Sequence, residues 1–283
     1  MRRLASRALG AAAFASLAVG ISGASLGAGA CGGEKFTSSA QSGDGGGVGD
    51  GGGVVDAASD AAQAPTFCAQ NTGHSFCDDF DRDVGDVKGP WDVIISAGAA
   101  AATLDPARSR SAPNALFAST KPGPQSGSAA GLQKLVGRAR DYHAMLDVYV
   151  DSYGDPSGQL FAFVLSLDFG QSLTLSLGMQ SPTSAVVLES SGGSNGKVHA
   201  LSKGFSSGQW VRVKLDVVLP SATNTNGSLK VALDGVSVVD DHLNLTAGAT
   251  LGDAKVSVGL FPGGGTTTSA WGFHFDNVLF DHG

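Results

Sequence analysis

The stretch WVRVKLDVVL (210–219) decides the fold class, because its apolar and polar residues alternate strictly. Val211, Val213, Leu215 and Val217 share one face, and Arg212, Lys214 and Asp216 share the other. A period of two belongs to a β-strand with one face buried and the other exposed. Working outward, the same rhythm recurs between Gly, Pro, Ser and Asn breakers, in the runs 91–96, 114–120, 131–136, 142–150, 159–169, 172–179, 185–190, 197–202, 229–241, 254–261 and 271–280. Since no window carries a sustained 3.6-residue apolar stripe, the sequence predicts an all-β sandwich or barrel.

Local patterns make this expectation more detailed. Asp234-Gly235 lies between two apolar runs and has the composition of a two-residue type I′ hairpin turn. In YHAMLDVYV (142–150) we expect the set beginning with Tyr142 to face the core, and the set beginning with His143 to face solvent or a groove. The run 159–169 is apolar on both faces, which favours a central strand covered on both sides.

Residues 1–30 are typical of a secretory signal, with a basic start and a stretch too rich in Ala and Gly for a permanent membrane span. Ala28-Gly29-Ala30-Cys31 fits a lipoprotein cleavage box, in which the Cys31 thiol is acylated. Ala28 and Ala30 equally fit ordinary A-x-A signal cleavage, so this alternative remains open. We expect an exported protein held by its N-terminal lipid at the outer membrane or cell surface; the alternative is a periplasmic or secreted protein.

Residues 31–65 hold almost no large apolar side chains and are therefore predicted to form a disordered tether. Residues 66–283 suffice for one domain with a sizeable core. The formal net charge is −7, and removal of the signal takes away three arginines to leave −10. The absence of any Lys/Arg cluster argues against a nucleic-acid partner.

The chain has three cysteines. If Cys31 carries lipid, Cys68 and Cys77 remain as a pair, close enough for a local disulfide in an oxidising compartment. Two buried free thiols are the alternative. A zinc site is disfavoured because the chain has neither C-x-x-C nor H-x₃₋₅-H.

Several of these motifs together resemble concanavalin A-like lectin/glucanase jelly rolls, and their C-terminal rhythm resembles laminin-G-like modules. The resemblance rests on the runs 209–215, 256–260 and 275–278, on Asp234-Gly235, and on the opening 76–80 followed by Trp91. It covers 76–280 and implies two stacked antiparallel sheets, pairing of the first and last strands, carbohydrate on a concave outer face, and frequent calcium sites. These motifs identify the sandwich and no particular ligand.

The glucanases of this fold place two catalytic Glu on one strand face. This chain has only two Glu, with Glu34 in the tether and Glu189 alone in its run, so the glucanase dyad is absent. The enzyme alternative is a polysaccharide lyase or atypical glycosidase. It requires polar residues from several strands to converge in one groove, drawn from His143, Tyr149, Asp168, His199 and Arg212.

The opening of the predicted domain is rich in Asp. Calcium prefers several carboxylate and carbonyl oxygens, and Asp79-x-Asp81-x-Asp83 offers them from one loop. If the first and last strands pair, Asp276 comes close. We therefore predict a structural Ca²⁺ held by some of Asp79, Asp81 and Asp276, against a solvated acidic turn as the alternative.

The leading functional hypothesis is a non-catalytic binding module for carbohydrate or cell-envelope glycan, with fold analogy as its warrant. Its candidate ligand residues are His143, Asp147 and Tyr149, which share the outward face of one strand. Trp91, Trp210 and Trp271 begin strands and are expected at core edges rather than on a platform. A structural or protein-binding envelope component is the third hypothesis.

Overall fold

A computed structural model describes residues 65–153, 156–157, 161–170, 173–181, 183–190, 196–220, 227–244 and 251–283, so the predicted signal, Cys31 and most of the tether lie outside the described residues. The elements are α1 (Phe67–Gln70), β1 (Phe76–Asp78), β2 (Val93–Ala97), β3 (Ala100–Asp105), β4 (Ala115–Thr120), β5 (Gly123–Pro124), β6 (Ala129–Gly137), β7 (Asp141–Ser152), β8 (Pro156–Ser157), β9 (Ala162–Asp168), β10 (Thr174–Ser181), β11 (Ser184–Ser190), β12 (Val198–Ala200), β13 (Trp210–Val218), β14 (Ser228–Leu233), β15 (Val236–His242), β16 (Ala254–Pro262), β17 (Thr266–Thr267) and β18 (Trp271–His282).

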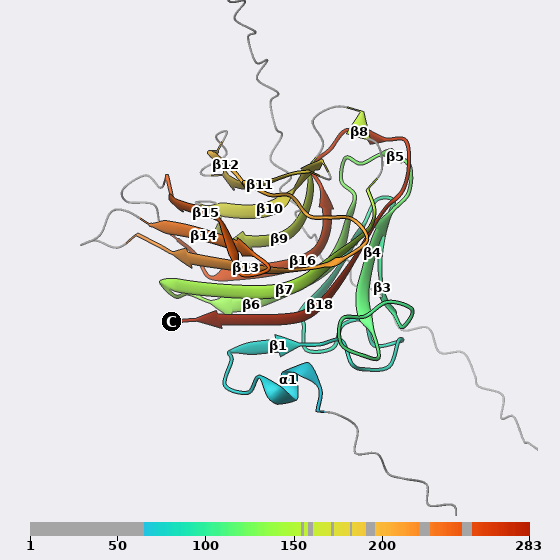
Figure 1. Cartoon of the computed structure of the whole chain (residues 1–283), viewed down its shortest axis with the longest axis horizontal. Helices are drawn as coiled ribbons and strands as arrows, with labels where there is room; N and C mark the ends of the chain where they lie inside the picture. Colours follow the sequence, from blue (N-terminus) through green and yellow to red (C-terminus); the bar gives the residue numbers. More distant parts are fainter. Residues whose placement is uncertain are drawn as a thin grey trace, which may run out of the picture. The chain divides into compact units, whose positions relative to one another are not determined.

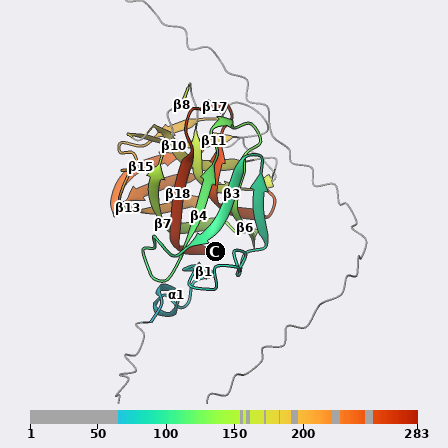
Figure 2. The same cartoon turned by 90° about the vertical axis from the view of Figure 1, so that its right-hand side faces the viewer.

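Two antiparallel sheets stack to form the predicted sandwich (Figure 1). Sheet A has the order β15-β14-β13-β7-β18-β4-β3, with β1 also paired to β18, and sheet B has the order β12-β11-β10-β9-β16-β6-β2. A small third sheet, β5-β17-β8, lies at the end of the sandwich remote from the C-terminus (Figures 1 and 2). The all-β jelly-roll prediction is confirmed, and no described helix is long and apolar enough to cross a bilayer.

The core is made by the inward residues of both sheets. On β7 the predicted inward set is fully buried, from Tyr142 to Val150, and the inward valines and leucine of β13 are buried as well. At about 25 cal/mol per Å² of apolar surface, this burial is the main favourable term in folding. The period-two pattern therefore identified the core face correctly on the two longest regular runs.

Two further expectations are confirmed by the backbone. The β14–β15 hairpin turns at Asp234 and Gly235, whose φ angles of 50° and 79° are both positive, as a type I′ turn requires. The first and last strands pair, with Phe76 opposite Phe280. The sequence pattern missed β3, because its Ala100–Asp105 run is too rich in alanine to alternate clearly.

Candidate functional site

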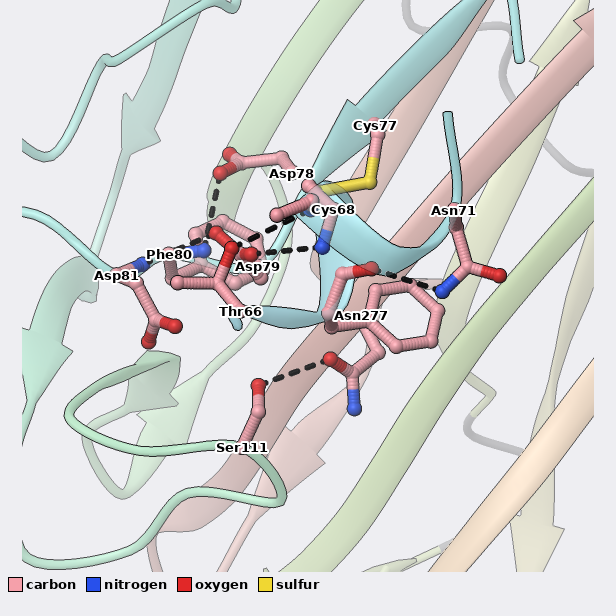
Figure 3. The surroundings of a disulfide bond; sticks show 12 residues. Thr66, Cys68, Asn71, Cys77, Asp78, Asp79, Phe80, Asp81, Ser111 and Asn277 are labelled. Atoms are coloured by element: carbon pink, nitrogen blue, oxygen red, sulfur yellow. Dashed lines mark hydrogen bonds between the residues drawn. A yellow bond between two sulfur atoms is a disulfide. The ribbon is translucent and has the colours of Figure 1, made fainter. Parts of the chain in front are cut away.

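The N-terminal segment of the described chain lies on the outer face of sheet A. The Arg212 guanidinium lies 5.8 Å from the Phe67 ring centre, which places α1 over β13. The predicted disulfide is present: Cys68 joins Cys77, with 5.7 Å between their Cα atoms (Figure 3). The bond ties α1 to β1 and so holds this segment against β18.

Asp147, one of the predicted ligand residues, is 1% exposed and fully engaged. Arg212 donates from Nε to Asp147 Oδ1 at 2.8 Å and from Nη2 to Oδ2 at 2.6 Å. Asn277 adds a third donor at 2.9 Å. The hydrogen bond with Asp147 raises the pKa of Arg212. The bidentate ion pair and the Asn277 hydrogen bond together join β7, β13 and β18. The position of Asp147 therefore does not support the expectation that it binds a ligand.

Asp276, predicted as a calcium ligand, holds the β3–β4 loop instead. Its Oδ2 accepts the backbone N–H groups of Arg110 and Ser111 at 2.6 and 2.9 Å, and its Oδ1 accepts that of Asn277 at 2.7 Å. Burial raises the pKa of Asp276 to about 7, although these donors act in the opposite direction. We call residues 106–114 the strap, because this anchor holds them across sheet A.

The other two predicted calcium ligands lie near the disulfide (Figure 3). Asp79 accepts the backbone N–H of Cys68 at 2.9 Å. Burial and the neighbouring Asp79 raise the pKa of Asp81 to about 6. Among the described residues, no group of three or more His, Cys, Asp or Glu side chains is arranged to hold a metal ion. The three predicted ligands are therefore not brought into one such group, and calcium binding stays a prediction.

Tyr149, the second predicted ligand residue, is half-buried at the centre of an aromatic row. Its ring centre lies 5.6 Å from that of Trp210 and 6.1 Å from that of His274. The Arg108 guanidinium from the strap lies 4.2 Å from the Tyr149 ring centre and pairs with Asp151 at 3.4 Å. The strap thus covers this ring, while Trp91 and Trp271 are buried in the core as expected.

His274 was missed by the sequence analysis, although it lies on the polar face of the last strand. It is 3% exposed, and its Nε2 lies 2.8 Å from Asp105 Oδ2. Burial lowers the pKa of His274, so the neutral ring donates through Nε2 and leaves Nδ1 as a buried acceptor with no partner among the described residues. The third predicted ligand residue, His143, lies six residues from Tyr149 along β7, exposed and 2.7 Å from Asp216.

His199 lies at the open edge of the sandwich, not on an outward face. Its Nε2 is 3.1 Å from Glu189 Oε2, and its Nδ1 is 2.9 Å from Asp241 Oδ2. The His199 and Glu189 side chains are each 1% exposed. Glu189 and His199 belong to sheet B and Asp241 to sheet A, so this ionic cluster fastens the two sheets together. With Asp168 on β9, the residues required by the enzyme alternative are spread over both sheets and do not converge.

The outer face of sheet B is different in character. Three half-exposed phenylalanines gather at one end of it: Phe161 and Phe163 stack with ring centres 5.6 Å apart and planes at 11°, and Phe261 is the register partner of Phe163. We call these three rings the platform. The prediction that the 159–169 strand is covered on both faces is thus only partly right, because its outward rings remain accessible.

Glycines make room for the platform rings. A Cβ on Gly178 would lie 2.9 Å from Phe163 Cδ1, and a Cβ on Gly131 would lie 2.9 Å from Phe261 Cζ. Both distances are shorter than normal carbon–carbon contact, so any larger residue would push the rings away. Glycines on neighbouring strands therefore let two rings lie close against the sheet.

Beside the platform runs a row of uncharged hydrogen-bonding groups. Ser176, Ser166, Ser257 and Gln133 occupy successive strands β10, β9, β16 and β6 in register. Ser166 and Ser176 are 3.3 Å apart, and Gln133 donates to Ser257 at 3.1 Å. On these four described strands, neither the serine row nor the platform row contains an ionisable side chain; Asp168 and Lys255 appear one row further on.

Comparison with known proteins gives the fold and no closer relationship. No family model and no curated protein sequence matches the chain. Among solved structures, an endo-β-1,4-glucuronan lyase from the fungus Trichoderma reesei is similar, with 14% identity, a TM-score of 0.58, and coverage of 74% of this chain and 96% of that one. A PL-14 alginate lyase from Aplysia kurodai gives 12% identity, a TM-score of 0.52, and coverage of 74% and 99%. The cellulose-induced protein Cip1 gives 12% identity, a TM-score of 0.53, and coverage of 72% of this chain and 96% of that one. At such identities the likeness shows that this chain has the jelly-roll β-sandwich fold that polysaccharide lyases also use.

Proposed function

We propose that this protein is a non-catalytic carbohydrate-binding protein, and that a glycan chain lies along the outer face of sheet B. The observation that carries this proposal is the platform beside the serine row. Aromatic rings offer flat apolar area for the C–H faces of sugar rings, while hydroxyl and amide groups meet the sugar hydroxyls. A glucuronan lyase and a cellulose-induced protein have the same fold, which supports this choice of ligand class.

The absence of charge on these two rows favours binding over chemistry. Acid–base catalysis needs a titratable group within hydrogen-bond reach of the reacting atoms. The platform row and the serine row carry none on the described strands, and on sheet A Arg212 is bonded to Asp147 and His274 to Asp105. The same feature favours a glycan with few or no charges, because an anionic chain would find no cation in these two rows, and Lys255 one row further on lies opposite Asp168.

The experiment is a binding assay that shows which of the two outer faces, that of sheet A or that of sheet B, binds the glycan. Phe163→Ala should weaken binding to the preferred neutral polysaccharide by about tenfold, the value of one aromatic contact of about 1.4 kcal/mol. The matched control is Tyr149→Ala, which removes a half-buried ring from sheet A and should leave affinity unchanged. Affinity electrophoresis and glycan arrays give the readout, with thermal melting to verify folding.

Two results would contradict the proposal. One is a glycan array without any binder, which would favour a structural or protein-binding role. The other is equal affinity for the wild type and the Phe163→Ala variant.

A polysaccharide lyase is the second candidate, favoured by one observation. His274 is neutral, has a bare Nδ1 and lies beside Tyr149. In such a reaction a base removes the C5 proton of a uronate, the C4–O bond breaks as a C4–C5 double bond forms, and an acid protonates the leaving oxygen. Ultraviolet absorbance of the unsaturated product, lost in His274→Ala, would support this candidate over pure binding.

Export and anchoring through an acylated Cys31 remain part of the proposal. The described chain begins at Pro65, next to α1. Labelling of cells with a radioactive fatty acid should mark the wild type and not Cys31→Ser. A mature wild-type protein free of fatty acid would contradict anchoring and favour the periplasmic or secreted alternative.

A further inference from the structure

A pocket with a cationic rim opens at the end of the sandwich opposite to the platform. It has a volume of about 400 Å³ and is lined by Arg138, Ala139, Arg140, Leu219, Pro220 and Leu251. Strand β16 fixes its distance from the platform, because Ala254 at one end pairs with Gly137, while Phe261 near the other end belongs to the platform. A ligand here would therefore occupy a site separate from the glycan face.

The backbone around the two arginines is held rigidly. Arg140 and Asp141 both donate N–H to the Gly283 carbonyl, at 3.0 and 3.1 Å, and Leu219 donates to the Arg140 carbonyl at 2.9 Å. The Tyr142 hydroxyl accepts the N–H of Ala139 at 2.6 Å. Three main-chain hydrogen bonds and one to a tyrosine hydroxyl mean that the backbone of the rim is formed before any ligand arrives.

Both guanidinium groups on this rim are free to bind a ligand. Arg138 and Arg140 are exposed, and neither makes an ion pair with another residue of the described chain. The other arginines seen to act on sheet A are each paired: Arg82 with Asp78, Arg108 with Asp151, and Arg212 with Asp147. In a protein of net charge −7, two unpaired arginines on one pocket are a local exception.

Both positive and negative side chains lie close to the pocket, and this limits the charge that a ligand can carry. Burial raises the pKa of Tyr142, Arg138 lowers it and Asp253 raises it, so the Asp253 carboxylate acts on the same site as Arg138. A multiply charged polyanion would meet this carboxylate. A single anionic group on a compact body suits the two arginines better, because Arg binds carboxylate and phosphate oxygens in a bidentate manner.

The remaining wall is apolar. Leu219 is buried and Leu251 and Pro220 are half-buried, so the ligand needs an apolar face as well as a charge. The volume lies within the range of small-molecule sites and accommodates a single sugar or a body of similar size. We propose that this pocket binds a compact organic anion, of which a carboxylated or phosphorylated sugar is the representative class.

Isothermal titration of the wild-type protein with glucuronate, glucose 6-phosphate, glucose and inorganic phosphate tests the proposal. We expect binding of glucuronate or glucose 6-phosphate at least about tenfold tighter than that of glucose or inorganic phosphate. The two sugar acids distinguish a carboxylate from a phosphate ligand. The double variant Arg138→Gln/Arg140→Gln should lose at least about tenfold in affinity for the preferred probe.

The matched control is Arg110→Gln, which removes an exposed strap arginine on another face and should bind as the wild type does. Phe163→Ala should also leave this binding unchanged, so failure of this pocket and failure of the platform are distinguishable. Because the substitutions are exposed, melting curves should coincide. Absence of binding by all four probes would overturn the proposal. So would inorganic phosphate binding as tightly as the sugar acids, or equal affinity in the double variant and the wild type.

Discussion

The outer faces of the two sheets use their polar groups in opposite ways. On sheet A, Asp147, Asp276 and His274 are buried and bonded to groups of the protein itself. On sheet B, the serine row and the platform are uncharged, and the rings are half-exposed. The difference teaches that the charged groups of sheet A hold segments of the protein together, while the uncharged outer face of sheet B remains available to a ligand.

The largest expected effect on stability comes from the cluster of Glu189, His199 and Asp241 at the open edge of the sandwich. His199→Ala leaves the buried Glu189 Oε2 without its partner, while Oε1 still accepts the N–H of Asn244. Breaking such a buried pair costs about 3–5 kcal/mol. Denaturant unfolding should show this loss with an unchanged m-value. His143→Ala, on an exposed histidine with a similar carboxylate partner, should cost under about 1 kcal/mol and is the control. Equal losses of unfolding free energy in both variants would remove the distinction between the buried pair and the exposed pair.

Next comes the anchor of the strap. Asp276→Ala leaves the N–H groups of Arg110 and Ser111 without their acceptor, at a cost of about 2–3 kcal/mol. Hydrogen exchange at these two amides should accelerate while glycan affinity is retained. A loss of glycan affinity in the folded variant would mean that sheet A, and not sheet B, carries the ligand.

A substitution under the platform has a smaller expected effect on stability. Gly178→Ala places a Cβ 2.9 Å from Phe163 Cδ1 and 2.5 Å from the Ala162 carbonyl, so ring and strand must shift. We expect a loss of about 1–2 kcal/mol together with weaker glycan binding. Gly85→Ala, with nothing within 4 Å, is the matched control. Unchanged glycan binding by Gly178→Ala would contradict the role given to the ring position.

The faces should also differ in their response to pH. The folded-state pKa of Asp276 is raised to about 7 and that of Asp81 to about 6, both from 3.8. Folding therefore takes up protons between about pH 4 and 7, and this contribution to stability declines as the pH rises through that window. Melting temperatures of the wild type should fall relative to Asp276→Asn across this range. Parallel profiles would show that Asp276 is ionised throughout.

Calcium gives the smallest effect. If Asp79 and Asp81 bind Ca²⁺, a concentration tenfold above its Kd adds about 1.4 kcal/mol, which is a rise in melting temperature of about 3–6 °C. The double variant Asp79→Asn/Asp81→Asn should lose this rise. No rise with millimolar calcium in the wild type would remove the calcium hypothesis.

Sequence reasoning predicted the strands, the hairpin at Asp234, the disulfide and the pairing of first and last strands. These features depend on local period, local turn chemistry or a resemblance that spans the domain. It did not reveal that Asp147 is buried, because alternation says that a residue points outward and not that Arg212 and Asn277 then bond to it. It also missed the platform, since Phe261 and Gly131 become neighbours only through the order of strands in sheet B.

The disulfide has a mechanical consequence. Tension along the residues that precede Cys68 passes through the sulfur atoms to Cys77, the middle residue of a strand bonded to β18. The intervening segment, including the second half of α1, is bypassed and carries no load. If the domain is pulled through the predicted tether, the pairing of β1 with β18 should break first. After reduction of the disulfide, the force should act on α1 instead.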